Sequence, residues 1–440
     1  MVRGRGGQPE VAGEFLRVRA AVSGADGLDQ VQRALHGLDQ RRRTVAGDHR
    51  TSQDRADLPP MSGTLVRVDR SVCRYLKFCP FPCRRRGGRL VATHRADRRT
   101  AGGATGGSTG GRSDMVDNDT RVDFYRQMVR IRAYEAALQA NYHADKTPQW
   151  DIGAGLIPGE MHLAAGQEPV AVGLCANLVK DDAITGPHRP HHLALAKGVD
   201  INKMTAEIYG RDTGLCHGKG GHMHLFDPEQ HFSCSGIIAE GMPVAVGQAL
   251  AFSRKGTDNV AVAVAGEGAA NQGAFHEALN LAAMWKLPVV FIIEDNDWAI
   301  SVARDTATPI KDGSLRGTAY GMPSQRVEGN DVEMIYEACK TAVERARAGG
   351  GPTLLEIHTV RMWGHFEGDA QAYRGDELNE ANERDPIPAY EKRLLSAGLL
   401  TEDQAAQIKA EAEAEVQAAI DFATSSPEPK PSDAYLHVFA

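Results

Sequence analysis

The clearest pattern of apolar and polar positions in this chain lies between residues 259 and 301. Two runs in which every residue is apolar, 260–265 and 289–293, flank a stretch whose apolar residues recur every three or four positions. The runs predict buried strands, and the period between them predicts a helix that Pro288 would end. Two buried strands joined by a helix are typical of a βαβ unit, so the pattern predicts an α/β fold with a parallel sheet.

Polar residues follow each of the two apolar runs directly. Gly266, Glu267 and Gly268 follow the first run, and Glu294, Asp295 and Asn296 follow the second. Ligands of open α/β sheets bind beyond the carboxyl ends of the strands. A carboxylate and an amide oxygen suit Mg²⁺, and glycines let the backbone approach a phosphate. The pattern predicts a site for a metal-bound diphosphate, although each half alone is more often an ordinary strand-to-helix turn.

The rest of residues 115–440 also carries periodic apolar positions bounded by capping residues. The predicted elements are a helix from an N-cap at Thr120 to about 142, helices over 169–178 and 332–348, a strand over 353–360, and a helix from a capping box at Thr401 to about 422.

Residues 1–114 have no sustained period and a different composition. They carry 22 of the chain's 50 Lys and Arg residues but only 11 of its 57 Asp and Glu residues. Such a segment buries too little apolar surface to offset the entropy of ordering, so we predict that it is disordered. We favour an extension upstream of a natural start at Met115, with 115–440 as the folded domain. The alternatives are a basic tail that binds nucleic acid and an organelle transit peptide.

The remaining body of the chain is strongly acidic. Residues 115–440 carry 28 Lys and Arg against 46 Asp and Glu, which argues against nucleic acid as the main partner. No apolar run approaches the ~20 residues of a membrane span, and no signal peptide opens the chain. The seven cysteines form no even, close-spaced framework, which indicates a reducing environment, so we predict a cytoplasmic protein.

Taken as a whole, residues 259–301 resemble the thiamine-diphosphate motif, in which Gly-Asp-Gly is followed farther along by Asn-Asn. The likeness is strongest to the α subunits of 2-oxo acid and acetoin dehydrogenases. In that family the acidic residue, the second Asn and a later backbone carbonyl hold Mg²⁺, which implies the ligands Glu267, Asn296 and Trp298. The resemblance also implies cofactor contacts at Gly266, Gly268 and Ala269.

Two residues depart from the commonest form of this motif. Glu267 stands where Asp is more usual, although branched-chain members also carry Gly-Glu-Gly. Asp295 replaces the first Asn and places another charge near the metal.

Three further segments are similar to the same family. Residues 186–192, Gly-Pro-His-Arg-Pro-His-His, resemble the His-Arg form of acetoin-type members. This implies that Arg189 pairs with a diphosphate oxygen, that His188 binds beside it, and that His191 lies on the active-site side as a catalytic residue. Residues 218–224 resemble a Gly-Lys-Gly-Gly-x-Met-His loop, and the turn after it implies cofactor contacts from Gly236 and Ile238.

The segment 362–369, Met-Trp-Gly-His-Phe-Glu-Gly-Asp, resembles the family's loop over the cofactor, again in its acetoin-type form. The resemblance implies that His365 is both a cofactor contact and a catalytic residue. Pyruvate-type subunits of animals carry a regulatory serine directly after this histidine, where Phe366 stands here.

The resemblance implies a doubly wound parallel sheet and an α subunit that depends on thiamine diphosphate and Mg²⁺. Such an enzyme cleaves acetoin or oxidatively decarboxylates a 2-oxo acid such as pyruvate, and it passes the acyl group to a lipoyl carrier. The implied partners are a β subunit, in a heterotetramer of two α and two β chains, and a lipoyl-bearing acyltransferase. A branched-chain 2-oxo acid dehydrogenase, a phosphate-binding enzyme without thiamine and a non-catalytic scaffold for a β chain remain alternatives.

Overall fold

The computed structural model describes residues 116–144, 146, 152–375 and 377–436. The predicted N-terminal extension, 1–114, lies outside the described residues, so its interpretation and the domain boundary at 115 stay predictions. Within the described part of the chain, no helix combines the length and the apolar character needed to cross a membrane.

Seven strands form one sheet, and every neighbouring pair is parallel except the short β2–β3 pair. The two predicted strands of the βαβ unit, β4 and β5, are adjacent and parallel in the middle of the sheet, as predicted. In spatial order the strands are β2 (Phe226–Asp227), β3 (Phe232–Cys234), β1 (Ala183–Gly186), β4 (Ala261–Gly266), β5 (Val289–Asp295), β9 (Thr353–His358) and β8 (Ser324–Val327).

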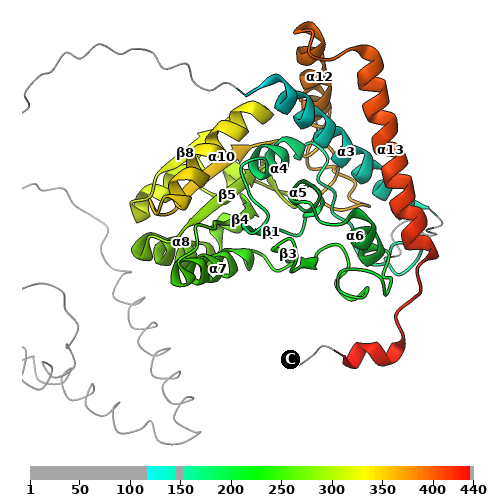
Figure 1. The fold of residues 1–440 in the computed structure, drawn as a ribbon, viewed down its shortest axis with the longest axis horizontal. Coiled ribbons are helices and arrows are strands. Elements are labelled where there is room, and N and C mark those ends of the chain that lie inside the picture. Colours follow the sequence, from blue (N-terminus) through cyan, green and yellow to red (C-terminus); the bar gives the residue numbers. More distant parts are fainter. Residues whose placement is uncertain (1–115, 145, 147–151, 376, 437–440) are drawn as a thin grey trace, which may run out of the picture. The chain divides into compact units, whose positions relative to one another are not determined.

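Helices cover both faces of this sheet (Figure 1). Alternate residues of β4 belong to different hydrophobic clusters: Val262 and Val264 pack on one face, and Ala261 and Ala263 on the other. This confirms the doubly wound α/β architecture. The helices of the first face are α4 (Glu168–Cys175), α5 (His191–Lys197) and α10 (Val332–Arg347), and those of the second are α7 (Gly241–Lys255) and α8 (Gly273–Trp285).

A further layer of helices packs outside the first face. In Figure 1 the long helix α13 lies along α3, with α12 at one end and α6 at the other. These helices are α3 (Asn118–His143), α6 (Ile201–Ile208), α12 (Pro386–Ser396) and α13 (Glu402–Ser425). The shorter elements are η3 (Ala269–Asn271), β6 (Trp298–Ala299), β7 (Val302–Ala303), α9 (Arg304–Ala307), η4 (Gly313–Tyr320), α11 (Glu377–Glu383) and η5 (Pro431–Tyr435).

One local prediction needs correction. Thr120 is not the N-cap of the first helix, because the Asp117 carboxylate accepts the backbone N–H of Thr120 at 2.9 Å and the helix starts earlier, at Asn118. Between Gly268 and the predicted helix, α8, the single turn of η3 intervenes. The capping box at Thr401 is confirmed.

Candidate functional site

A cavity of about 580 Å³ lies at the carboxyl ends of the central strands. Segments that follow β1, β3, β4 and β5 all contribute to its wall. Strand β1 lies between β3 and β4, so the chain changes direction across the sheet here, at the kind of switch point where open α/β sheets bind ligands. The predicted residues that line this cavity are His188, Arg189, Gly236, Ile238, Gly266, Glu267, Gly268, Ala269, Asn296, Trp298 and His365.

Glu267 follows β4 and is 7% exposed. One of its carboxylate oxygens accepts the backbone N–H of Asn296 at 3.4 Å, so the ends of β4 and β5 meet here. Burial, reinforced by the nearby carboxylate of Asp295, raises the pKa of Glu267 to about 7. Burial makes this carboxylate costly to ionise when it has no partner, and a bound cation would stabilise its ionised form.

Asn296 has a side chain suited to the same cation. Its Nδ2 donates to Oε1 of Gln167 at 3.3 Å, whereas its Oδ1 is buried and has no hydrogen-bond partner in the described part of the chain. Trp298, the third predicted ligand, lines the same cavity. A carboxylate, an unpartnered amide oxygen and a backbone carbonyl are the hard oxygen donors that Mg²⁺ prefers, so these residues fit the metal.

The sequence predicts that Gly268 lets the backbone approach a phosphate, but the structure shows another reason for a glycine at this position. A Cβ at this position would lie 2.5 Å from the Cβ of Ala299, on the short strand β6. The glycine therefore allows the turn after β4 to pack against the segment that carries Trp298. At Gly266 the nearest obstacle is 3.9 Å away, so close packing of the protein does not require that glycine.

Arg189 follows β1 and is 4% exposed. Its guanidinium donates to the backbone carbonyls of Leu163 and, at 2.9 Å, of His365. Burial and the neighbouring Arg361 lower the pKa of Arg189 to about 10. A buried guanidinium at a cavity wall, with another close by, favours an anionic ligand such as a diphosphate.

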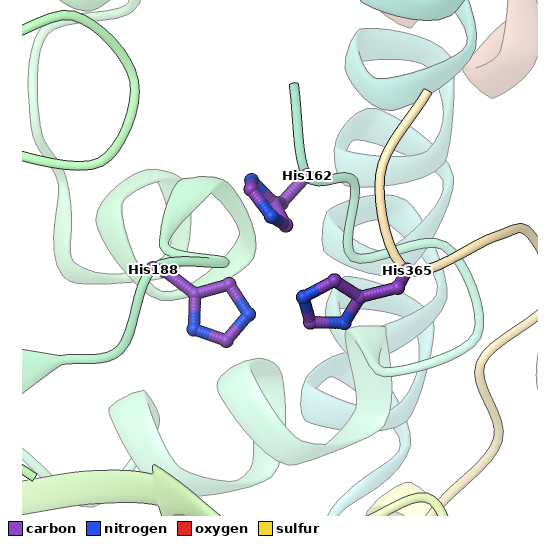
Figure 2. Close-up of side chains that lie close together, drawn as sticks. All are labelled: His162, His188 and His365. Atoms are coloured by element: carbon purple, nitrogen blue, oxygen red, sulfur yellow. The ribbon is translucent and has the colours of Figure 1, made fainter. Parts of the chain in front are cut away.

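Three histidine rings lie close together on the wall of the same cavity (Figure 2). The ring centroid of His162 lies 4.8 Å from that of His188 and 4.9 Å from that of His365. Burial and the charge of Arg189 lower the pKa of both His188 and His365 to about 3 and hold that of His162 far below its usual range. The three imidazoles are therefore neutral near pH 7.

Three neutral imidazoles could in principle bind zinc. However, the positive charges of Arg189 and Arg361 that keep His365 unprotonated would repel a metal ion in the same way. One of these guanidinium nitrogens, Nη1 of Arg361, lies 3.4 Å from Nδ1 of His365. The cluster is better suited to exchange hydrogen bonds with an uncharged or anionic ligand.

His191 does not line the cavity. It is fully buried, and its Nδ1 lies 3.1 Å from Oε2 of Glu135 on α3. The geometry gives no support to its catalytic role, which stays a prediction. The adjacent His192 forms a second buried pair, 2.7 Å from Oε1 of Glu294.

The charge of Asp295 is paired with Arg304, and neither residue lines the cavity. Asp295 is fully buried and does not line the cavity, and one carboxylate oxygen lies 2.7 Å from Nη1 of Arg304. The other oxygen accepts the backbone N–H of Asp297 at 3.0 Å. The negative charge that Asp295 adds to the Asn-Asn motif is thus paired with the positive charge of Arg304.

Sequence reasoning missed three residues of this site: His162, Gln167 and His222. His162 and Gln167 line the cavity from the Gly- and Pro-rich segment before α4, which has no hydrophobic period to indicate its path. His222 occupies the variable position of the 218–224 loop and contacts His162. Its only sequence signal was an imidazole at a position that the resemblance left unspecified.

The match to known proteins agrees with this geometry. The dehydrogenase E1 component family matches residues 127–432. The chain is 41% identical over 318 residues to the α subunit of acetoin:2,6-dichlorophenolindophenol oxidoreductase of Bacillus subtilis, covering 72% of this chain and 92% of that protein. For the corresponding subunit of Cupriavidus necator the identity is 39% over 327 residues, covering 74% and 95%.

A relative with a different name is similar to the same extent. The pyruvate dehydrogenase E1 component subunit α of Rhizobium meliloti is 39% identical over 334 residues, covering 75% of this chain and 92% of that protein. This chain therefore belongs to the dehydrogenase E1 component family, as the α subunit of a thiamine-diphosphate- and Mg²⁺-dependent oxidoreductase that works with a β subunit.

Proposed function

We propose that this α subunit serves an enzyme that cleaves acetoin. The observation that carries the proposal is the convergence of Glu267, the unpartnered amide oxygen of Asn296 and buried Arg189 on one cavity. The choice of acetoin is supported by the names of two relatives and by Phe366, which stands where animal pyruvate-type subunits carry a serine. Oxidative decarboxylation of pyruvate is the second candidate, because the Rhizobium relative bears that name.

The chain's own residues would divide the work between two parts of the cavity wall. Glu267, Asn296 and the Trp298 carbonyl would hold Mg²⁺, and Arg189 would bind a diphosphate oxygen. When bound, the cofactor supplies a thiazolium carbon that adds to a carbonyl group. The neutral rings of His162, His188 and His365 (Figure 2) would form hydrogen bonds with the hydroxyl or carbonyl oxygen of the substrate.

The cavity would be completed by a β subunit, in an assembly of two α and two β chains. Three apolar side chains on its wall are largely exposed: Ile237 at 63%, Ile238 at 48% and Ile300 at 56%. Apolar side chains clustered at the rim of a binding site are typical of a surface that a partner covers. A lipoyl-bearing acyltransferase would then accept the acyl group.

The test is to co-express the chain with a candidate β chain and assay the purified complex with an artificial electron acceptor. Acetoin, pyruvate and 3-methyl-2-oxobutanoate are compared, each with and without thiamine diphosphate and Mg²⁺. We expect cofactor-dependent turnover that is fastest with acetoin and absent from the α chain alone. A complex that binds the cofactor and prefers a 2-oxo acid would refute the acetoin assignment. A complex that assembles without binding the cofactor would refute the enzymatic role.

A further inference from the structure

His222 is the only residue of the 218–224 loop that contacts His162 by hydrogen bonds in the described chain. Its Nε2 lies 3.1 Å from the backbone nitrogen of His162 and 3.1 Å from Nδ1 of the same residue. A backbone N–H can only donate, so Nε2 of His222 must be unprotonated and act as the acceptor. Because the backbone N–H of His162 is the donor, it determines which nitrogen carries the proton in the rings of His222 and His162.

Because Nε2 of His222 is an acceptor, Nδ1 of His162 must carry a proton and donate to it. Burial and the surrounding charges, Arg189 included, hold the pKa of both rings well below the usual range, so both are neutral. In a neutral imidazole only one nitrogen is protonated. Nε2 of His162 therefore keeps its lone pair, and it makes no hydrogen bond within the described residues.

The position of His222 is itself fixed by a buried carboxylate. Glu207 on α6 is fully buried and accepts backbone N–H groups of the loop that leads to His222, from Gly218 at 2.9 Å and from Gly220 at 2.7 Å. It also accepts those of Cys216 at 2.7 Å and Gly221 at 3.3 Å. Four donors on one carboxylate hold the loop in a single conformation. The acceptor that faces His162 is thus preorganised.

We propose that His222 is a positioning residue that selects the Nδ1–H tautomer of His162, so that the lone pair of Nε2 is available in the cavity as a hydrogen-bond acceptor. The ring of His162 lines the cavity, edge-on to those of His188 and His365 (Figure 2). The acceptor would receive a hydroxyl proton of the substrate, and this part of the inference rests on the proposed function. The tautomer does not depend on which substrate is used.

The first test compares two variants at one position in the complex with its β chain. His222→Leu removes the acceptor, whereas His222→Gln keeps an amide oxygen within reach of His162. We expect His222→Leu to lower kcat about 10–100-fold, the usual effect of losing a group that orients a functional histidine. The concentration of thiamine diphosphate giving half-saturation should stay unchanged, and His222→Gln should recover most of the turnover. Equal kcat in wild type and His222→Leu, or an equal loss in both variants, would overturn the proposal.

The second test does not use activity. The complex is labelled with ¹⁵N in its histidine rings and studied by solid-state NMR, and the signals of His162 are assigned by their loss in His162→Gln. We expect a protonated Nδ1 and an unprotonated Nε2 in wild type and in His222→Gln, and a mixture of tautomers in His222→Leu. A protonated Nε2 in wild type would overturn the proposal. A complex inert towards every substrate would instead refute the proposed function and leave this measurement decisive for the tautomer.

Discussion

Two parts of the cavity wall, the metal end (Glu267 and Asn296) and the histidine end (His162, His188 and His365), are assembled in different ways. At the metal end, Glu267 and Asn296 follow β4 and β5, which are adjacent parallel strands in register from Ala261 with Val289 to Gly266 with Glu294. At the histidine end, His162, His188 and His365 come from three segments that are far apart in the chain. The first end follows from one βαβ unit, whereas the second depends on how distant loops are held together.

This difference has a consequence for how each end should respond to mutation. The metal ligands are fixed by strand register and should tolerate changes elsewhere in the molecule. The histidine end relies on side chains that bind backbone carbonyls, such as Arg189 on Leu163 and His365. We therefore expect mutations at the metal end to act on cofactor affinity, and those at the histidine end to act on loop position and turnover.

The largest effect is expected from Glu267→Gln. This change keeps the length of the side chain and an oxygen ligand but removes the charge that faces Mg²⁺. We expect thiamine diphosphate binding at fixed Mg²⁺ to weaken about 100-fold, or by about 3 kcal/mol. Glu267→Asp should weaken cofactor binding less, because the charge is kept and only the length of the side chain is reduced. Titration of the cofactor into the assembled complex measures both, and wild-type affinity in Glu267→Gln would show that Glu267 is not a ligand.

Arg189→Lys tests the residue that joins the two ends. Lysine keeps the charge but loses the planar fork that holds the carbonyls of Leu163 and His365. We expect about tenfold weaker cofactor binding, equivalent to about 1.4 kcal/mol, together with faster proteolysis of the 362–369 segment. Arg393→Lys is the control, since its side chain is 43% exposed and pairs with Asp331 on the outer surface. Unchanged proteolysis in Arg189→Lys would mean that Arg189 does not hold the 362–369 segment, so it would not join the two ends.

The pH dependence of stability tests the histidine end when wild type is compared with a variant of one of its histidines. His188 and His365 have pKa values of about 3 when folded, against about 6.5 when unfolded. Below pH 6.5 the unfolded state binds protons that the folded state does not, so the free energy of unfolding falls as the pH drops from 6.5 towards 3. Each ring changes the free energy of unfolding by at most about 1.4 kcal/mol per pH unit.

The measurement is the melting temperature of the complex between pH 7 and pH 5, for wild type and for His188→Gln. We expect the variant to lose less stability over this range than wild type, because one depressed group has been removed. His217→Asn is the control, since His217 is exposed and outside the cavity. Parallel curves for wild type and His188→Gln would mean that His188 titrates normally.

The same contrast explains what the sequence could predict. Apolar runs and a helical period located β4, α8 and β5, and therefore Glu267 and Asn296, because these depend on residues near one another in the chain. His162 lies in a segment without a period, and its place beside His365 depends on the Arg189 contacts, which no local pattern reveals. The resemblance supplied His188, Arg189 and His365, but it also placed His191 on the active-site side, and the fold buries that ring against Glu135.

The smallest effect on the cofactor is expected from Asp295→Asn, which restores the commoner Asn-Asn form of the motif. The Asp295 carboxylate faces Arg304 and not the cavity. Breaking a buried ion pair is costly when it leaves a charge unpaired. Here Arg304 keeps Asp297 and Glu356, each at 3.5 Å, so we expect a loss of only about 1–2 kcal/mol in the free energy of unfolding.

Cofactor affinity in Asp295→Asn should stay within about threefold of wild type, a change of under about 0.7 kcal/mol. Asp297→Asn is the matched control, because it removes a charge from the same arginine at a half-exposed position. Chemical denaturation and cofactor titration of both variants separate the two effects. A gain in cofactor affinity well beyond threefold, seen in Asp295→Asn only, would mean that the effect of Asp295 on Glu267 extends to the bound metal despite Arg304. The pairing would then be incomplete, and strand register would not be the only feature that shapes that end of the cavity.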